Sequence, residues 1–206
     1  MRLQQYLNED TWSYDDMVSL IKANCKPFLK DWQSKYIGKF LYSGRDSSKN
    51  YDIKTIRKNR RPMSMHIAMH NIIDDWFYKK FSVRARSNAM FGSFNDDHAS
   101  EYGDVYMIFP IGKYMMLSSD KVRDLYVKIS YEIRKTHPGF LMDMYDNYLD
   151  SGKLNAKQVE LTIINFLEKS NYKKNIYNLN EQMVICKKYY MVHGDYEHLL
   201  KKDLLK

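Results

Sequence analysis

The sequence predicts an α+β fold, and three features of its apolar pattern lead to that class. Apolar residues recur at helical spacing before residue 38 and again between residues 62 and 81. Apolar runs of strand length are found at 39–43, 88–93, 105–109, 113–117 and 181–192. Further helical patterns, at 120–135, 140–149 and 155–167, lie between the middle strands and the last ones. Helices therefore flank and interrupt a set of short strands.

The N-terminal segment predicts two helices and a strand. Residues 1–13 are polar and lead into a helix for which Ser13, followed by two acids, suits the N-cap position. Pro27 begins a second helix that Gly38 ends. The run Lys39–Ser43 then has the composition of a short strand.

The long helix that follows predicts core structure. Pro62 suits its first position, and its apolar side chains continue at helical spacing to Phe81. His66 and His70 stand four residues apart on this helix, a spacing compatible with a metal. No glutamate lies between them and no third ligand is evident, so we expect no metal site.

The stretch Arg84–Pro110 places polar residues between apolar runs. It predicts a strand at 88–93, a helix at 95–102 with Asn95 as its N-cap, and a strand at 105–109 that Pro110 ends. Ser93 and Tyr102 would then lie on the two sides of one strand-helix-strand unit. This unit either forms a pocket wall or only turns the chain.

The remainder predicts strand 113–117, helix 120–135, an αα insertion broken at Asp150-Ser151-Gly152, and a polar surface loop at 169–180. Glu181 opens the last apolar run, which reads as two strands or as one bent strand. An acid at the beginning of such a strand lies at a sheet edge, where a ligand could meet it. The residues from Tyr196 to Lys206 form a basic amphipathic helix or a frayed tail.

Length and composition predict one folded domain. The 206 residues suffice for one buried core, and 44% hydrophobic with 28% charged residues argues against wholesale disorder. We expect a helical cap over 1–38, a core over 39–193 with a helical insertion at about 138–170, and a basic tail over 194–206. No window approaches the roughly 18 apolar residues that cross a bilayer, so we expect no membrane insertion. The two cysteines are far apart and form no CxxC pair, which favours a reducing cytoplasm.

Charge and aromatic content favour an anionic partner. The net charge is +8, and the segment 49–61 carries six basic side chains against the single acid Asp52. These cations either neutralise phosphates or form a solvated basic loop. The aromatic content of 15% includes eighteen tyrosines, whose rings fill a core or stack on bases.

Three short motifs occur in order: LYSGR at 41–45, FGSFNDDHASEYG at 91–103 and NEQMV at 180–184. This order resembles the ADP-ribosyltransferase superfamily. Its members carry a strand ending in an aromatic residue, then Arg or His, then Gly; an aromatic-x-Ser pattern before a helix with Ala and Tyr; and a late Glu at the start of a strand. The matching residues are Tyr42, Gly44, Phe91, Ser93, Ala99, Tyr102 and Glu181.

The resemblance implies a split, mixed or antiparallel β core that binds NAD and breaks the bond between nicotinamide and ribose. It implies that Glu181 holds the ribose and favours its positive charge, with Ser93 placing the carboxylate and the ribose. Tyr102 would stack on the nicotinamide, and Gly44 would let the ligand approach the backbone. Arg45 or Arg86 would meet the diphosphate. The implied cofactor-binding set is Tyr42, Ser43, Gly44, Arg45, Arg86, Phe91 and Tyr102.

Two departures from the family pattern keep other functions open. Ser43 stands where the family has Arg or His, so either Arg45 reaches the diphosphate from a shifted position or NAD binding is altered or lost. Leu179 stands two residues before Glu181, where the arginine-modifying branch has Glu and another branch Gln, which argues against protein arginine and leaves another acceptor on a host protein, or a nucleic-acid base, open. The alternatives are an inactive binding protein or inhibitor on the same fold, and a basic nucleic-acid-binding protein.

The run RRPMS…DDWFYKKF…RARSNAMFGSFNDD…YGDVYMIFPIGKY also resembles uncharacterised proteins of tailed bacteriophages. Phages use such transferases on host machinery and encode inhibitors of host defence. This resemblance implies a role in host takeover, in the bacterial cytoplasm or in the virion.

Overall fold

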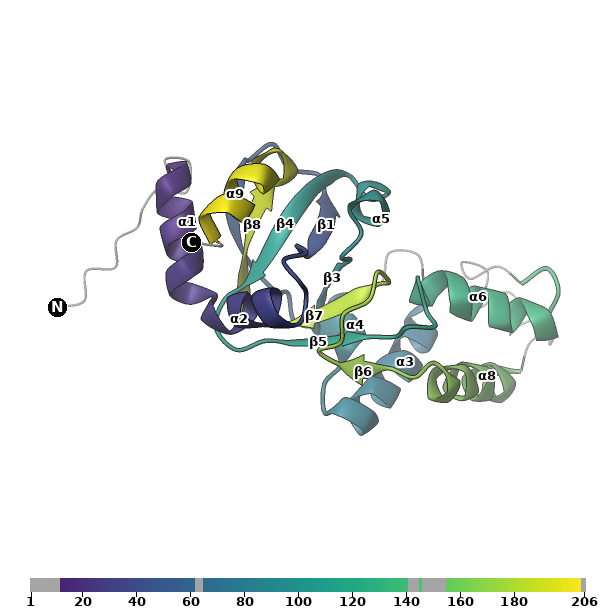
Figure 1. Ribbon diagram of the computed structural model, residues 1–206. Coiled ribbons are helices and arrows are strands. Elements are labelled where there is room, and N and C mark those ends of the chain that lie inside the picture. Colours follow the sequence, from purple (N-terminus) through teal and green to yellow (C-terminus); the bar gives the residue numbers. More distant parts are fainter. Residues whose placement is uncertain (1–11, 62–64, 141–144, 146–154, 205–206) are drawn as a thin grey trace. The chain divides into compact units, whose positions relative to one another are not determined.

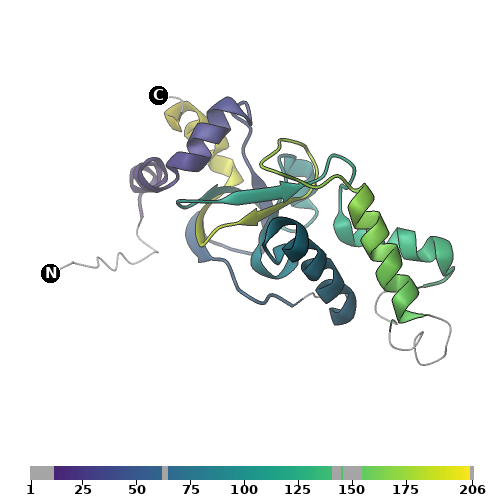
Figure 2. The same cartoon turned by 90° about the horizontal axis from the view of Figure 1, so that it is seen from below.

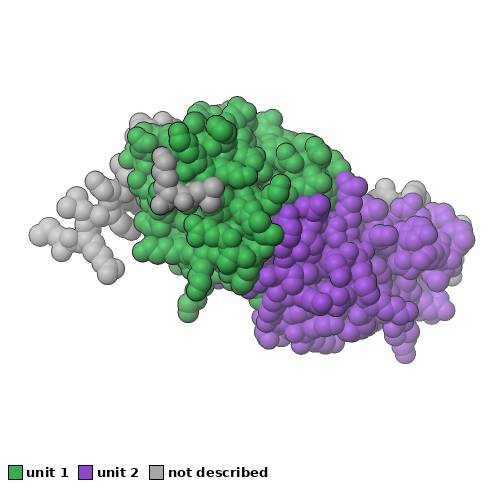
Figure 3. Space-filling view, in the orientation of Figure 1, with its two compact units in different colours: residues 1–56, 92–115, 186–206 green, residues 57–91, 116–185 purple. Residues whose placement is uncertain are grey.

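The computed structural model describes residues 12–61, 65–140, 145 and 155–204 (Figure 1). Two compact units make up the chain, coloured separately in Figure 3. Unit 1 comprises residues 1–56, 92–115 and 186–206, and unit 2 comprises residues 57–91 and 116–185. The chain thus passes from one unit to the other four times. The single domain expected from length and composition stays a prediction.

Unit 1 consists of helices and one antiparallel sheet. The sheet order is β1-β4-β8-β2, from the strands β1 (Tyr42–Arg45), β2 (Tyr51–Thr55), β4 (Asp104–Pro110) and β8 (Lys188–His193). The helical elements are α1 (Tyr14–Asn24), α2 (Lys26–Ser34), α5 (Asp96–Ser100), the 3-10 helix η3 (Gly194–Tyr196) and α9 (Glu197–Leu204). The first and last helices, α1 and α9, lie side by side (Figure 1).

Aromatic residues form the core of unit 1. Phe28 of α2 and Phe40 both place their rings edge-on to Phe109 of β4, at centroid distances of 6.0 and 5.8 Å. Trp32 stacks on Phe40 at 5.1 Å. All four side chains are buried, so the sequence's aromatic surplus fills the core here.

Unit 2 combines helices with a second four-stranded sheet. Its sheet order is β3-β7-β5-β6, from the strands β3 (Met90–Gly92), β5 (Met115–Ser118), β6 (Lys173–Lys174) and β7 (Gln182–Ile185). Its helices are α3 (Ile67–Phe81), α4 (Ala85–Asn88), α6 (Leu125–Thr136) and α8 (Ala156–Lys169). Figure 2 shows α8 beside α6, and α8 packs against both α3 and α6.

These elements confirm the α+β class, with helices and two antiparallel sheets. Local capping signals are confirmed as well: Ser13 forms a capping box with Asp16, and Asn95 accepts a hydrogen bond from the backbone of His98. The expected helix at 155–167 is α8, capped by Asn155. The last apolar run forms the two strands β7 and β8, and the C-terminal residues form the helix α9.

Several boundaries differ from the expectation. The strand expected over 88–93 is shorter, because β3 covers only Met90–Gly92 and Asn88 belongs to the short helix α4, which was not predicted. The helix expected from residue 120 begins at Leu125, because Asp124 supplies its N-cap. Strand β2 lies within the basic segment 49–61, where a loop was expected. The predictions for Pro62, for most of 1–13 and 140–149, and for the break at 150–152 concern residues outside the described ones. No helix in the described part of the chain has both the length and the apolar character needed to cross a bilayer.

Candidate functional site

The predicted site residues fall into two groups, one in each unit. Strand β1 carries the first group of unit 1. The backbone of Tyr42 exchanges two hydrogen bonds with Ser93, at 2.7 and 2.8 Å, which joins the first motif to the second. The side chain of Ser43 is buried in this sheet. Backbone pairing therefore brings together two of the predicted site residues, Tyr42 and Ser93, from different motifs.

Gly44 is explained by close packing. A Cβ atom there would lie 2.1 Å from the carbonyl oxygen of Ala99 and 2.8 Å from the carbonyl carbon of Tyr102. No side chain fits at such distances, so β1 needs glycine for α5 and the residues after it to approach. The space beside the Gly44 backbone is thus occupied by protein, and that packing alone accounts for the residue.

The other residues of this group differ in accessibility. The Tyr102 ring is 60% exposed and stands edge-on to His98 at 6.0 Å. The Ser93 hydroxyl is buried and accepts a hydrogen bond from the backbone N–H of Asn95 at 3.0 Å, so it helps start α5. The Nε atom of Arg45 is buried and has no hydrogen-bond partner among the described residues. Tyr102 is the member best placed to stack on a ligand.

Glu181 is the centre of the group in unit 2. Its backbone N–H donates to the carbonyl of Arg123 at 3.0 Å, which fixes the chain just before β7. Its side chain is 15% exposed, and Oε1 lies 3.8 Å from Nη1 of Arg86, whose side chain is 14% exposed. Within the described residues, Oε1 accepts no hydrogen bond. A mostly buried ion pair therefore stands at the beginning of the strand.

Two arginine side chains lie over the ring of Phe91. The guanidinium carbons of Arg86 and Arg60 each lie 4.7 Å from the centre of its ring. The backbone N–H of Arg60 donates to the carbonyl of Ser87 at 3.1 Å, which ties the basic segment to α4. We define Glu181, Arg86, Phe91 and Arg60 as the carboxylate cluster.

Burial raises the pKa of Glu181 from 4.5 to about 7. Arg86 and Arg60 oppose this rise by favouring the charged carboxylate, whereas Asp124 adds to it by like-charge repulsion. A hydrogen bond from the backbone of Leu125 also lowers the pKa. Near neutral pH the carboxylate cluster therefore contains an acid that is close to half ionised.

His66 and His70 make separate contacts with different partners. His66 is the N-cap of the helix, with Nδ1 accepting the backbone N–H of Ala68 at 3.2 Å, while His70 contacts Ser87 at 3.0 Å through Nε2. Among the residues that the structure describes, no three His, Cys, Asp or Glu side chains are grouped to hold a metal ion.

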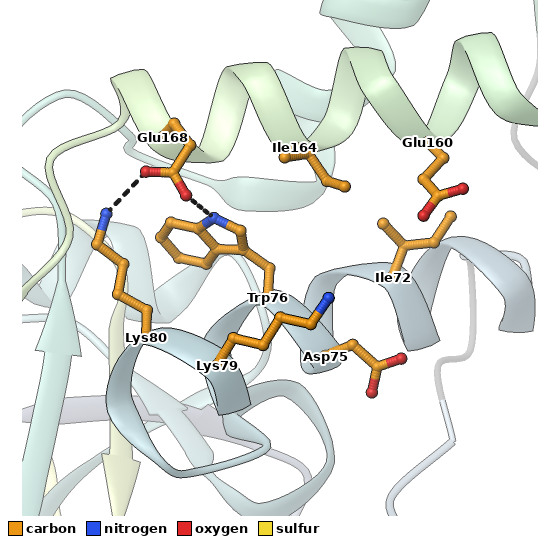
Figure 4. A pocket seen from close by; sticks show the side chains of 8 residues that line it. All are labelled: Ile72, Asp75, Trp76, Lys79, Lys80, Glu160, Ile164 and Glu168. Atoms are coloured by element: carbon orange, nitrogen blue, oxygen red, sulfur yellow. Dashed lines mark hydrogen bonds and ion pairs between the residues drawn. The ribbon is translucent and has the colours of Figure 1, made fainter.

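A groove of about 450 Å³ lies between α3 and α8 in unit 2 (Figure 4). At one end Glu168 accepts a hydrogen bond from the indole N–H of Trp76 at 2.6 Å and pairs with Lys80 at 3.1 Å. Ile72 and Ile164 face each other farther along the groove. None of the predicted site residues belongs to its described lining, so the groove lends no support to an NAD site.

Comparisons with known proteins yielded no match, whether to family models, to curated proteins or to solved structures.

Sequence reasoning named Glu181, Arg86 and Phe91 as site residues but missed Arg60 and also Asp74, whose Oδ1 accepts the backbone N–H of Arg86 at 2.7 Å. Arg60 was assigned only to the basic segment, because nothing in the sequence signals its position over Phe91. Asp74 was also missed. It lies one helical turn after His70 on α3, and a buried polar pair at that spacing on a core helix was the available signal.

Proposed function

We propose that the protein is a mono-ADP-ribosyltransferase that moves ADP-ribose from NAD to a macromolecular acceptor, protein or nucleic acid. The observation that carries the proposal is the mostly buried Glu181 at the beginning of β7, paired with Arg86 beside Phe91. The family resemblance expects a carboxylate in this strand position. The two antiparallel sheets agree with the split β core that the resemblance implies.

The chemistry suits a carboxylate in such surroundings. Cleavage of the bond between nicotinamide and ribose develops positive charge on the ribose, and a carboxylate removed from water stabilises that charge more strongly than one in bulk solvent. The ionised form of Glu181 performs this role. Arg86 supports it, because a nearby cation favours ionisation of a carboxyl group whose burial opposes it.

Residues of unit 1 have more modest roles in the proposal. The exposed ring of Tyr102 suits stacking on a nicotinamide. Ser93 holds the start of α5 through its hydroxyl, so within unit 1 it acts on the ligand by shaping the chain. Arg45 remains a candidate for the diphosphate.

The test is transfer of label from NAD. The purified protein is incubated with NAD labelled in the adenylate moiety and a bacterial extract, and label is measured in the protein and nucleic-acid fractions. Wild type is expected to transfer label, and Glu181→Gln to lose transfer by a factor of about 100 or more, in line with removal of one group that stabilises the transition-state charge. Glu160→Gln, at a solvent-exposed position of α8 in the groove that contains none of the predicted site residues, is the matched control and should transfer normally. Absence of label from both fractions would refute the proposal.

A second candidate is a binding protein on the same fold that has no catalytic activity. The buried Ser43 favours it, because this side chain provides no cation where the family carries Arg or His. Calorimetry with NAD separates the two candidates. Heat of binding at micromolar NAD contradicts the inactive protein, whereas no heat at millimolar NAD supports it.

A further inference from the structure

A buried polar cluster in unit 2 has no part in the chemistry above. It consists of His70 and Asp74 on α3 and Ser87 on α4. These residues are 3%, 1% and 9% exposed, respectively. Nε2 of His70 lies 3.0 Å from the hydroxyl of Ser87 and 3.4 Å from Oδ2 of Asp74. The Ser87 hydroxyl also donates to Oδ2 of Asp74. We call these three residues the α3–α4 cluster.

Asp74 supplies the N-terminal cap of α4 from another helix. Arg84 stands at the N-cap position, but within the described chain its side chain makes no capping hydrogen bond. Instead, Oδ1 of Asp74 accepts the backbone N–H groups of Arg86 and Ser87, at 2.7 and 3.3 Å. These are N–H groups that a helix start leaves without intrahelical partners. The carboxylate of Asp74 thus closes the beginning of α4.

The charge on Asp74 is maintained by the same contacts. Burial by itself raises the pKa of a carboxyl group, but hydrogen bonds from His70, Ser87 and the Arg86 backbone outweigh burial here and hold the pKa of Asp74 below its usual value. An ionised carboxylate makes stronger hydrogen bonds to backbone N–H groups than a neutral acceptor does. The cap on α4 is therefore of the strong kind.

This cap fixes the position of the Arg86 backbone. A helix of four residues has too few internal hydrogen bonds to hold itself in place, so its position depends on tertiary contacts. The backbone N–H of Arg86 is bound to Asp74, while its guanidinium lies over Phe91 and 3.8 Å from Glu181. Arg86 thus links the two clusters, because its backbone N–H binds Asp74 of the α3–α4 cluster and its guanidinium belongs to the carboxylate cluster.

We propose that Asp74 is a positioning residue, which fixes Arg86 against Glu181 through the cap on α4 and so acts on the candidate catalytic carboxylate from the α3–α4 cluster. The catalytic part of this inference rests on the function proposed for Glu181. The positional part does not, because it concerns two carboxyl groups and one arginine in the protein without ligand.

The experiment follows the titration of the Glu181 carboxyl by carbon NMR in the full chain labelled at glutamate. Arg86, Arg60, Asp124 and the hydroxyl of Tyr172 all interact electrostatically with the Glu181 carboxyl. The variants therefore leave these residues in place, except for the reference variant, which replaces Arg86. Arg86→Gln is that reference. It should raise the midpoint by about one pH unit, because it removes a neighbouring cation.

Asp74→Ala should raise the same midpoint by a similar amount, since Arg86 loses its anchor. Asp74→Asn retains one acceptor oxygen and should give a smaller rise in the same direction, and it serves if the alanine variant does not fold. Asp75→Ala is the matched control, because the next side chain on α3 is 53% exposed and pairs with Arg84 instead. It should leave the midpoint unchanged.

A midpoint that moves in Arg86→Gln but stays fixed in the folded Asp74 variants overturns the proposal. The titration contains no NAD, so its outcome does not depend on the transfer assay. A protein that transfers no label but shows the expected shifts contradicts the proposed function alone. A protein that transfers label but shows no shift in the Asp74 variants contradicts the positioning role alone.

Discussion

Replacing Glu181 by glutamine should stabilise the protein at alkaline pH. The folded state holds the carboxyl proton with a pKa of about 7, compared with 4.5 for an exposed glutamate. Between these values the folded protein binds more protons than the unfolded chain, so the free energy of unfolding falls as pH rises. A pKa difference of about 2.5, at 1.36 kcal/mol per unit, amounts to roughly 3 kcal/mol lost between pH 4 and pH 8.

Glutamine has nearly the same shape but no charge to bury. We therefore expect Glu181→Gln to equal wild type near pH 4 and to exceed it by roughly 3 kcal/mol at pH 8, since the pKa of about 7 already includes the attraction to Arg86. Urea unfolding followed by circular dichroism at both pH values measures this difference. Glu160→Gln, at an exposed position on α8, should show no such gain. A Glu181→Gln protein that is less stable than wild type at pH 8 would refute the reasoning.

Three further predictions concern single contacts. Gly44→Ala should lower the free energy of unfolding by about 1 to 3 kcal/mol, since its Cβ would lie 2.1 Å from a backbone oxygen. The control Gly112→Ala, with none of the described atoms within 4 Å but a φ of +68°, should lose only about 1 kcal/mol, and urea unfolding measures both variants. Asp124→Asn keeps an N-cap on α6 but removes a negative charge, so the NMR titration midpoint of Glu181 should fall. Ser82→Gly should stabilise by up to about 1 kcal/mol in urea unfolding, because the C-cap of α3 has a φ of +61°.

The elements that the sequence predicted well are those whose signals are local. Ser13 and Asn95 cap helices through residues three positions away, and the pattern that decides them lies within one helical turn. Helix α8 likewise follows from its own spacing of apolar residues. Such elements need no knowledge of the rest of the chain.

The elements that were missed depend on distant partners. Strand β2 is a short edge strand with both Asp52 and Lys54, and it forms by pairing with β8, more than 130 residues later in the chain. Helix α4 is capped by Asp74, which lies 12 residues before Arg86 in the chain and on another helix. No local pattern indicates either contact, so no strand was predicted within the basic segment 49–61 and no helix was predicted over 85–88.

The candidate site divides in the same way. The motif order identified Glu181 at the beginning of a strand, which the structure has at β7. The position of Arg60 over Phe91 and the capping role of Asp74 are tertiary facts, and a sequence pattern does not contain them. Gly44 shows the converse, because the residue matched a family motif while its packing against α5 supplies a sufficient structural reason.

Stability itself supports a functional role for Glu181. A neutral residue there would raise the free energy of unfolding at neutral pH by roughly 3 kcal/mol. That is a considerable fraction of the 5 to 15 kcal/mol typical of whole domains. The chain instead keeps a buried acid, supplies Arg86 to compensate it in part, and anchors Arg86 by a second buried carboxylate, Asp74. Structural cores do not need such an arrangement, since apolar residues of similar volume serve them at least as well. Carboxyl groups whose pKa is shifted in this way are concentrated at functional sites. For this reason the proposed chemistry is assigned to Glu181 and not to the groove between α3 and α8.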